Sequence, residues 1–177
     1  DAALLARLGR RFDAVATVKG GALIFTRAGS ATTASGRDLG ELTLTRDKGD
    51  RHVWRTAERE AYGGASASWH DVNAGERRTV TVGAGARGKD PKKLRKVYAT
   101  EAEASRVAQA EANRARRAEA TLTYELARGR PELFPERRVR VSGLKPEIDA
   151  ARWIVVRCVH ALGDPGLTTS LELEIAT

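Results

Sequence analysis

WIVVRCVH at residues 153–160 and TTSLELEI at residues 168–175 lie on either side of the turn LGDPG, residues 162–166. Pro and Gly in that turn break regular structure, so the two runs are predicted to be the strands of a hairpin. In the second run every other residue is polar and projects from one face: Thr168, Ser170, Glu172 and Glu174. This period of two predicts one strand face in water and the other in a core. The first run is apolar on nearly both faces, so we expect it to lie deeper in the sheet, in a β-rich domain that continues to the last residues.

Length and composition indicate a globular protein. The chain has 177 residues, of which 41% are hydrophobic and 31% charged, a balance typical of folded domains. No apolar run approaches the roughly 20 residues that span a bilayer, and no signal-peptide pattern is visible. The chain contains no Met and opens inside an amphipathic pattern, so we expect it to be a piece of a longer protein.

The first 40 residues are predicted to complete one domain and lead into another. Leu4, Leu5, Leu8 and Phe12 form one helical stripe, and the strand-like runs 15–18 and 22–26 flank a Lys-Gly-Gly turn. A helix plus a hairpin is too small to hold a core alone. We therefore expect residues 1–28 to be the C-terminal end of a preceding small α/β domain, and residues 29–40, which are small and polar, to be a linker.

Residues 41–177 are predicted to form one β-barrel-like domain with a single inserted helix. Strand signals recur before the closing hairpin at 42–45, 51–59, 62–69, 77–82, 120–127 and 137–142, and a glycine-rich, then basic loop is expected over 83–96. A helix is expected over about 100–118, because Thr100 and Glu103 form a capping box before a narrow face of small residues. The predicted fold class is α+β, mainly β, with an antiparallel barrel or sandwich carrying the helix.

No catalytic constellation stands out in the sequence. His52, His70 and His160 are far apart and lack the spacing of metal ligands. Cys158 lies among valines, where Cys acts as a small buried hydrophobe rather than a reactive thiol. The sequence therefore predicts no catalytic residue, no cofactor site and no metal site.

The net charge of +8 is concentrated in residues 87–117, where ten basic residues stand against four acidic ones. The segment could be a solvated loop and helix face, or it could meet an acidic protein surface or nucleic acid. Only Tyr98 could offer base stacking there. The candidate basic patch comprises Lys89, Lys92, Lys93, Arg95, Lys96, Arg106, Arg114, Arg116 and Arg117.

Several segments in order resemble the C-terminal part of the bacteriophage late control gene D protein family. They are VYATEAEA (97–104), LARGRPELFP (126–135), VSGLKPEID (141–149), WIVVR (153–157) and GLTTSLELE (166–174), with RRFDAVATVK (10–19) and ASWHD (67–71) fitting as well. The likeness covers nearly the whole chain.

The resemblance implies a structural baseplate hub protein of a contractile tail and not an enzyme. Members of that family form a trimeric ring of tail-tube-like domains that joins the tail tube to a membrane-piercing spike. The implied partners are other copies of the chain, tube proteins and spike proteins. The implied location is the virion baseplate after synthesis in the bacterial cytoplasm, without membrane insertion by this chain. Under this reading Thr168, Ser170, Glu172 and Glu174 are a candidate subunit or tube interface.

Two alternatives from other functional classes remain open. The first is a basic nucleic-acid-binding module acting through residues 87–117, which would retain DNA in a salt-dependent way. The second is a cell-wall hydrolase, for which the sequence offers no pair of carboxylates in a recognisable motif.

Overall fold

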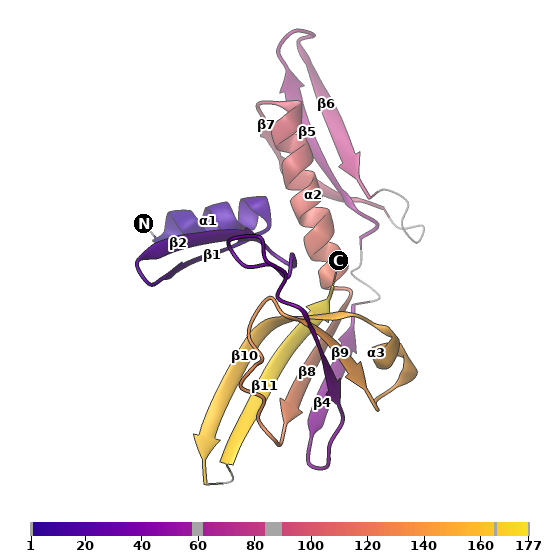
Figure 1. The fold of residues 1–177 in the computed structure, drawn as a ribbon. Helices are drawn as coiled ribbons and strands as arrows, with labels where there is room; N and C mark the ends of the chain where they lie inside the picture. Colours follow the sequence, from indigo (N-terminus) through magenta and orange to yellow (C-terminus); the bar gives the residue numbers. More distant parts are fainter. Residues whose placement is uncertain (1, 58–61, 84–89, 165, 177) are drawn as a thin grey trace. The chain divides into compact units, whose positions relative to one another are not determined.

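The structure is a computed structural model that describes residues 2–57, 62–83, 90–164 and 166–176. Its residues divide into two units (Figure 1). Unit 1 comprises the described residues of Asp1–Arg27 and Glu58–Arg116, and unit 2 comprises Ala28–Ala57 with those of Arg117–Thr177. The division cuts across the predicted domain 41–177, because a separate sheet and apolar cluster form within residues 65–112.

Unit 1 begins with a helix packed on a two-stranded hairpin. The β1–β2 turn uses Gly20 and Gly21 at φ of 59° and 76°, a conformation that glycine adopts without strain, and the predicted hairpin is confirmed. Phe12 meets Phe25 edge to face, with ring centroids 6.4 Å apart. The elements are α1 (Ala2–Phe12), β1 (Ala14–Lys19) and β2 (Ala22–Arg27).

The rest of unit 1 is a three-stranded sheet covered by the predicted helix. Its strands are β5 (Ala65–Asp71), β6 (Glu76–Val82) and β7 (Lys92–Tyr98), in the order β6-β5-β7, and the helix is α2 (Glu101–Arg117). The small-residue face of α2 packs as predicted, with Ala104 and Ala108 buried against Ala65 and Ala67. The backbone N–H of Glu103 donates to Thr100 Oγ1 at 3.2 Å, which is the threonine half of the predicted capping box, whereas the Glu103 carboxylate pairs with Arg11.

Strand β7 was not predicted. Residues 92–96 were expected to continue the loop from Gly83, of which residues 84–89 lie outside the described residues. Four of the seven β7 residues are Lys or Arg, and the pairing with β5 shifts register between Ser66 and Ser68. The shift interrupts the alternation of buried and exposed positions that marks a strand in sequence.

Unit 2 is a six-stranded curled sheet (Figure 1). Its order is β3-β9-β10-β11-β8-β4, antiparallel throughout except for the parallel β3–β9 pair. The predicted fold class, α+β and mainly β, is confirmed, and the sheet forms half of a barrel. The elements are β3 (Glu41–Thr45), β4 (Arg51–Thr56), β8 (Ala120–Leu126), β9 (Arg138–Ser142), α3 (Pro146–Ala150), β10 (Trp153–Gly163) and β11 (Gly166–Ile175).

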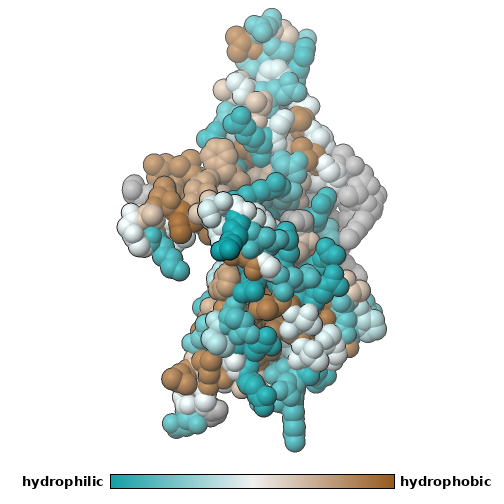
Figure 2. All heavy atoms as spheres, viewed as in Figure 1, coloured by the Kyte–Doolittle hydropathy of each residue, from teal (hydrophilic) through white to brown (hydrophobic). Residues whose placement is uncertain are grey.

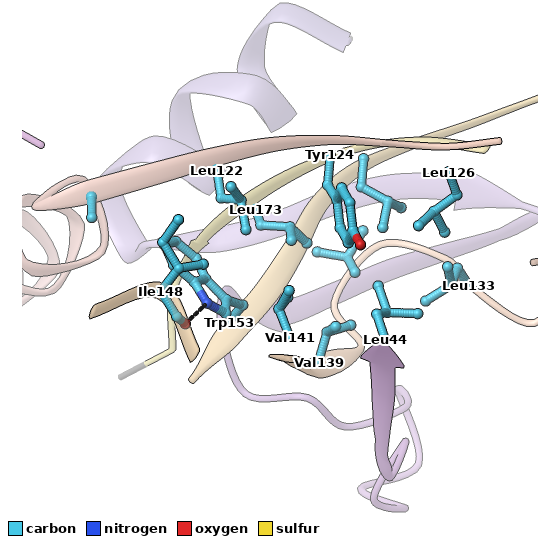
Figure 3. Close-up of a cluster of buried hydrophobic side chains, with 13 residues drawn as sticks. Leu44, Leu122, Tyr124, Leu126, Leu133, Val139, Val141, Ile148, Trp153 and Leu173 are labelled. Atoms are coloured by element: carbon cyan, nitrogen blue, oxygen red, sulfur yellow. Dashed lines mark hydrogen bonds between the residues drawn. The ribbon is translucent and has the colours of Figure 1, made fainter. Parts of the chain in front are cut away.

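Two short segments cover the apolar face of this sheet (Figure 3). Ile148 of α3 is fully buried, and its carbonyl accepts the indole N–H of Trp153 at 3.0 Å. Leu133, in the segment between β8 and β9, is 1% exposed and packs into the same cluster. We name residues 128–137 the strap. Sheet side chains from β3, β8, β9, β10 and β11 complete the core.

The predicted linker 29–40 is ordered within unit 2. Ala31 is fully buried, Thr32 bridges to Asp38, and the N–H of Gly29 donates to Glu136 Oε2 at 2.7 Å. Small residues suit a flexible linker, but they also allow a segment to pack closely on the strap. Composition alone therefore does not show whether such a segment is a linker or an ordered part of the fold.

Tyr124 supplies a polar contact inside the core. Its ring is fully buried, and its hydroxyl donates to Asp50 Oδ2 at 3.1 Å. The same carboxylate accepts the N–H groups of Asp47 and Ala127, so it fixes the β3–β4 turn against the end of β8. Burial, and next the charge of Asp50, raise the pKa of Tyr124 well above its usual range.

We predict that Tyr124→Phe changes how stability depends on pH. Loss of the hydroxyl should lower the free energy of unfolding by about 1 kcal/mol near neutral pH. The folded pKa is the higher one, so the unfolded chain releases this proton first and the wild type loses stability as pH rises above about 10. The phenylalanine variant lacks that loss, so the difference in free energy of unfolding between the two proteins should shrink. Urea unfolding at about pH 8 and about pH 10.5 tests this, with the exposed Tyr62→Phe as the control; a gap that is constant with pH would contradict it.

Candidate interaction surfaces

The polar row on β11 is only partly free. Ser170 and Glu172 are exposed, and Glu172 forms a 3.0 Å ion pair with Arg157 of β10. Thr168 and Glu174 are half-buried, because Thr168 donates to the Ala161 carbonyl and Glu174 lies 3.6 Å from the buried Arg117. The structure therefore leaves two of the four predicted interface residues exposed, and Glu174 has a structural partner that the alternation pattern does not reveal.

β10 leaves the sheet core halfway along its length. The prediction that the run 153–160 lies deep in the sheet is confirmed for Trp153–Val155 and wrong for the remainder, because all but one of the following β10 residues are exposed. The cause is pairing: β9 pairs with β10 only at Trp153 and Ile154. From Val156 onward, that edge of β10 has no strand beside it within the described residues, and Leu162 near the hairpin tip is 83% exposed. An apolar strand with an open edge is typical of a surface that pairs with another chain.

The strap is held across the β10–β11 hairpin by hydrogen bonds. His160 Nε2 donates to the Leu133 carbonyl at 3.0 Å, and His160 Nδ1 lies within hydrogen-bond distance, 2.9 Å, of Thr169 Oγ1. Thr169 Oγ1 in turn accepts the N–H of Arg130 at 3.0 Å. A Cβ at Gly129 would lie 2.4 Å from Leu167 Cγ, so the strap can approach the hairpin only with glycine there. His160 thus has a structural role, because its ring connects the strap to the hairpin.

Cys158 belongs to the same arrangement. Its Sγ lies 3.5 Å from the Leu133 carbonyl and 3.4 Å from His160 Nε2, and it is half-buried. Burial raises the pKa of the Cys158 thiol, which disfavours the reactive thiolate. A cysteine beside a histidine could suggest a nucleophile and its base, but both ring nitrogens of His160 are already engaged.

The predicted basic patch is dispersed over several environments. Lys92 and Arg114 both contact Glu111, and Arg117 is buried beside Glu174. Lys96 lies over the Tyr98 ring, with Nζ 5.4 Å from its centroid. Arg106 lines a cavity of about 210 Å³ with Phe12, Asp13, Arg27, Gln109, Ala110 and Asn113. Lys93, Arg95 and Arg116 are exposed, whereas Lys89 lies outside the described residues. The predicted patch therefore includes paired, buried and exposed charges.

An apolar surface covers α1 and the β1–β2 hairpin (Figure 2). Its exposed side chains are Leu4, Phe12, Val18, Leu23 and Phe25, with Val18 65% exposed. Val18 lies directly opposite Leu23 in the hairpin register. Gly9 is the one residue of α1 that is buried, so the amphipathic stripe of this helix is left largely uncovered.

Neither a metal cluster nor a membrane-spanning helix is found in the part of the chain that the structure describes. No group of three or more His, Cys, Asp or Glu side chains in these residues could hold a metal ion. No described helix has the length and apolar character needed to cross a bilayer.

Comparison with known proteins gives consistent matches. The sequence model of the phage tail baseplate hub (GPD) family matches residues 1–166. A probable baseplate hub protein of Escherichia phage 186 is 37% identical over 213 aligned residues, covering 99% of this chain and 55% of that protein. Its counterpart in Escherichia phage P2 is 34% identical over 212 residues, with the same coverage. The chain thus spans about half the length of these curated relatives.

Solved structures share the fold at lower identity. A tail protein from Neisseria meningitidis MC58 has a TM-score of 0.62 and 15% identity, covering 98% of this chain and 53% of that protein. A 43 kDa tail protein of prophage MuSo2 from Shewanella oneidensis has a TM-score of 0.59 and 17% identity, covering 97% and 51%. A chain in the virion of a native gene transfer agent particle has a TM-score of 0.56 and 19% identity, covering 98% of this chain and 38% of that chain.

We predict that His160→Ala releases the strap without unfolding the sheet. The Leu133 carbonyl and Thr169 hydroxyl each lose a hydrogen-bond partner, which should cost about 1–3 kcal/mol in local stability. Hydrogen exchange should speed up at the amides of Gly129, Arg130 and Glu136, and remain slow in β8 and β9. Val159→Ala, one residue away and 44% exposed, is the matched control. Unchanged exchange in the strap would contradict the role given to His160.

Proposed function

The chain belongs to the phage tail baseplate hub family, and from this premise we propose that it helps form a ring joining the tail tube to the membrane-piercing spike. It is a structural component of a virion tail. The single observation that best supports the ring is the edge of β10, which is apolar from Val156 onward and has no strand beside it among the described residues. A sheet with an unpaired apolar edge is stabilised when a neighbouring chain covers it. In a homotrimeric hub that neighbour is another copy.

The outward row on β11 is the proposed subunit or tube interface. Ser170 and Glu172 project from the sheet next to the open part of β10, since Val159 pairs with Ser170 and Arg157 with Glu172. The exposed Val159 and the Arg157–Glu172 ion pair therefore lie in one patch. An apolar centre with a polar surround is the usual anatomy of a protein–protein interface.

We infer further that the chain acts without catalysis. Cys158 and His160, the closest approach to a nucleophile and base, are both engaged with the strap. The dispersal of the basic residues does not favour the nucleic-acid-binding alternative acting through residues 87–117. Degradation of peptidoglycan by the purified full-length protein would contradict the non-catalytic assignment.

We also propose that residues 1–28 complete a small α/β domain with polypeptide of the full-length hub outside this chain. The support is the uncovered apolar surface of α1 and β1–β2, together with the greater length of the relatives. Apolar side chains such as Val18 and Leu23 each gain about 1.5–3 kcal/mol when fully buried.

The interface is tested in the full-length protein with the double variant Ser170→Arg and Glu172→Arg. Glu174 is left unchanged, because replacing it would remove its contact with the buried Arg117, and an effect on folding could then be mistaken for an effect on assembly. We expect this variant to sediment as a monomer where the wild type forms trimers, because two arginines beside Arg157 repel an apposed surface. The control Asn73→Arg with Glu76→Arg makes the same charge change at the exposed β5–β6 turn. Trimers that persist in the first variant would refute the interface.

The proposal that the apolar surface of α1 and β1–β2 is covered in the full-length hub is tested by cysteine labelling. Val18→Cys should react with a maleimide quickly in this chain and at least about tenfold more slowly in the full-length hub, because burial blocks access to the thiol. Lys19→Cys, at the exposed turn, should react equally fast in both. Equal rates for Val18→Cys in the two proteins would show that the surface stays uncovered.

A further inference from the structure

One face of the three-stranded sheet in unit 1 is rich in hydrogen-bond donors and cations. The alternation of β5 directs Ala65 and Ala67 toward α2, so Ser66 and Ser68 lie on the opposite face. The strand register places Thr81 and Lys93 on either side of Ser66, and Thr79 and the exposed Val97 on either side of Ser68. His70, on the same face, pairs with Arg77. We name this the donor face: Ser66, Ser68, Arg77, Thr79, Thr81 and Lys93.

Two hydroxyls of this face, those of Ser68 and Thr79, are connected to each other and to Arg77. Arg77 Nη2 donates to Ser68 Oγ at 3.2 Å, and Ser68 Oγ lies 3.1 Å from Thr79 Oγ1. Ser66 and Ser68 are 6% and 8% exposed, so they form the floor, while Arg77, Thr79, Thr81 and Lys93 are exposed at the sides. A partner lying across the sheet would meet cations on both flanking strands.

No carboxylate balances these cations on the described strands of this face. Asp71 and Glu76 are the acidic residues of the three strands, and alternation places both on the α2 side with Trp69 and Val80. Asp71 is engaged there, 3.3 Å from Arg78. Surfaces that serve solubility alone mix charges of both signs, and cross-strand pairs of opposite charge stabilise a sheet. The donor face has neither property.

Protection of sheet edges explains only part of this composition. A lysine such as Lys93 on edge strand β7 discourages pairing with foreign strands. Protection against foreign strands does not explain Ser66 and Ser68, because they lie on the central strand β5, whose two edges are already paired. The hydroxyls add hydrogen-bond donors in the middle of the face, between the two cationic edges.

We propose that the donor face binds a carboxylate-rich surface of a neighbouring protein. Guanidinium and ammonium groups form charge-assisted hydrogen bonds with carboxylates, and hydroxyls donate to them as well. Binding of single-stranded nucleic acid is disfavoured, because the aromatic residues of the sheet, Trp69 and Tyr98, pack on the α2 side and cannot stack on bases here. This surface belongs to unit 1, and the inference does not depend on the proposed ring.

The experiment measures fluorescence anisotropy of labelled poly-L-glutamate with the purified chain at low ionic strength. Arg77→Gln with Lys93→Gln should weaken binding about tenfold, because two exposed ion contacts together contribute on the order of 1–2 kcal/mol. Arg37→Gln with Lys48→Gln, two exposed cations of unit 2, gives the same net charge and should leave binding nearly unchanged. Arg77→Lys with Lys93→Arg keeps the charge and should retain binding. Circular dichroism and thermal melting confirm that each variant is folded.

Three results would overturn the proposal. If the wild-type chain does not bind poly-L-glutamate, the donor face is not a binding site for carboxylate-rich surfaces. Equal weakening in the two glutamine pairs would show that net charge, not the donor face, governs binding. Tighter binding of single-stranded DNA of matched charge, lost in the Arg77→Gln and Lys93→Gln variant but not in its control, would assign the face to nucleic acid instead.

Discussion

The structure of unit 2 depends on covering one face of a curled six-stranded sheet. A half-barrel cannot bury its own concave face, so other parts of the chain must do so. Here α3 contributes Ile148 and the strap contributes Leu133, both almost completely buried in the core (Figure 3). Burial of a leucine side chain stabilises the fold by about 1.5–3 kcal/mol, and the hydrogen bond from His160 to the Leu133 carbonyl of the strap fixes where that burial occurs. The β10–β11 hairpin therefore contributes side chains to the core and also holds the strap that covers this core.

Because one face of the sheet must be covered, the two faces of the β10–β11 hairpin have different surroundings. Inward positions such as Leu171 and Thr169 are buried in the core or bonded to the strap. Outward positions such as Ser170 and Val159 have no such partner, and β10 extends past the end of β9. A hub component needs a rigid core together with surfaces that stay available until assembly. Unit 2 offers an open strand edge for this purpose, and unit 1 offers an apolar surface and a cationic one.

Local sequence signals predicted the local structure well. The alternation over 168–175, the Gly20–Gly21 turn and the Thr100 cap each act within a few residues, so the sequence predicted β11, the first hairpin and α2. Features that depend on distant partners were missed. The pairing of Glu174 with Arg117, the assignment of β7 to the sheet and the short overlap of β9 with β10 all arise from tertiary contacts. The dispersal of the basic segment has the same origin, because a sequence count cannot show that Lys92 and Arg114 share Glu111.

The most direct test of the hub assignment is electron cryomicroscopy of tail tips from the virion that contains the full-length protein. The account predicts a ring of copies between the last tube layer and the spike, with the edge of β10 beyond Val155 covered by a neighbouring subunit. Density for this fold outside the tube–spike junction, or a ring in which that edge remains open to solvent, would contradict the account.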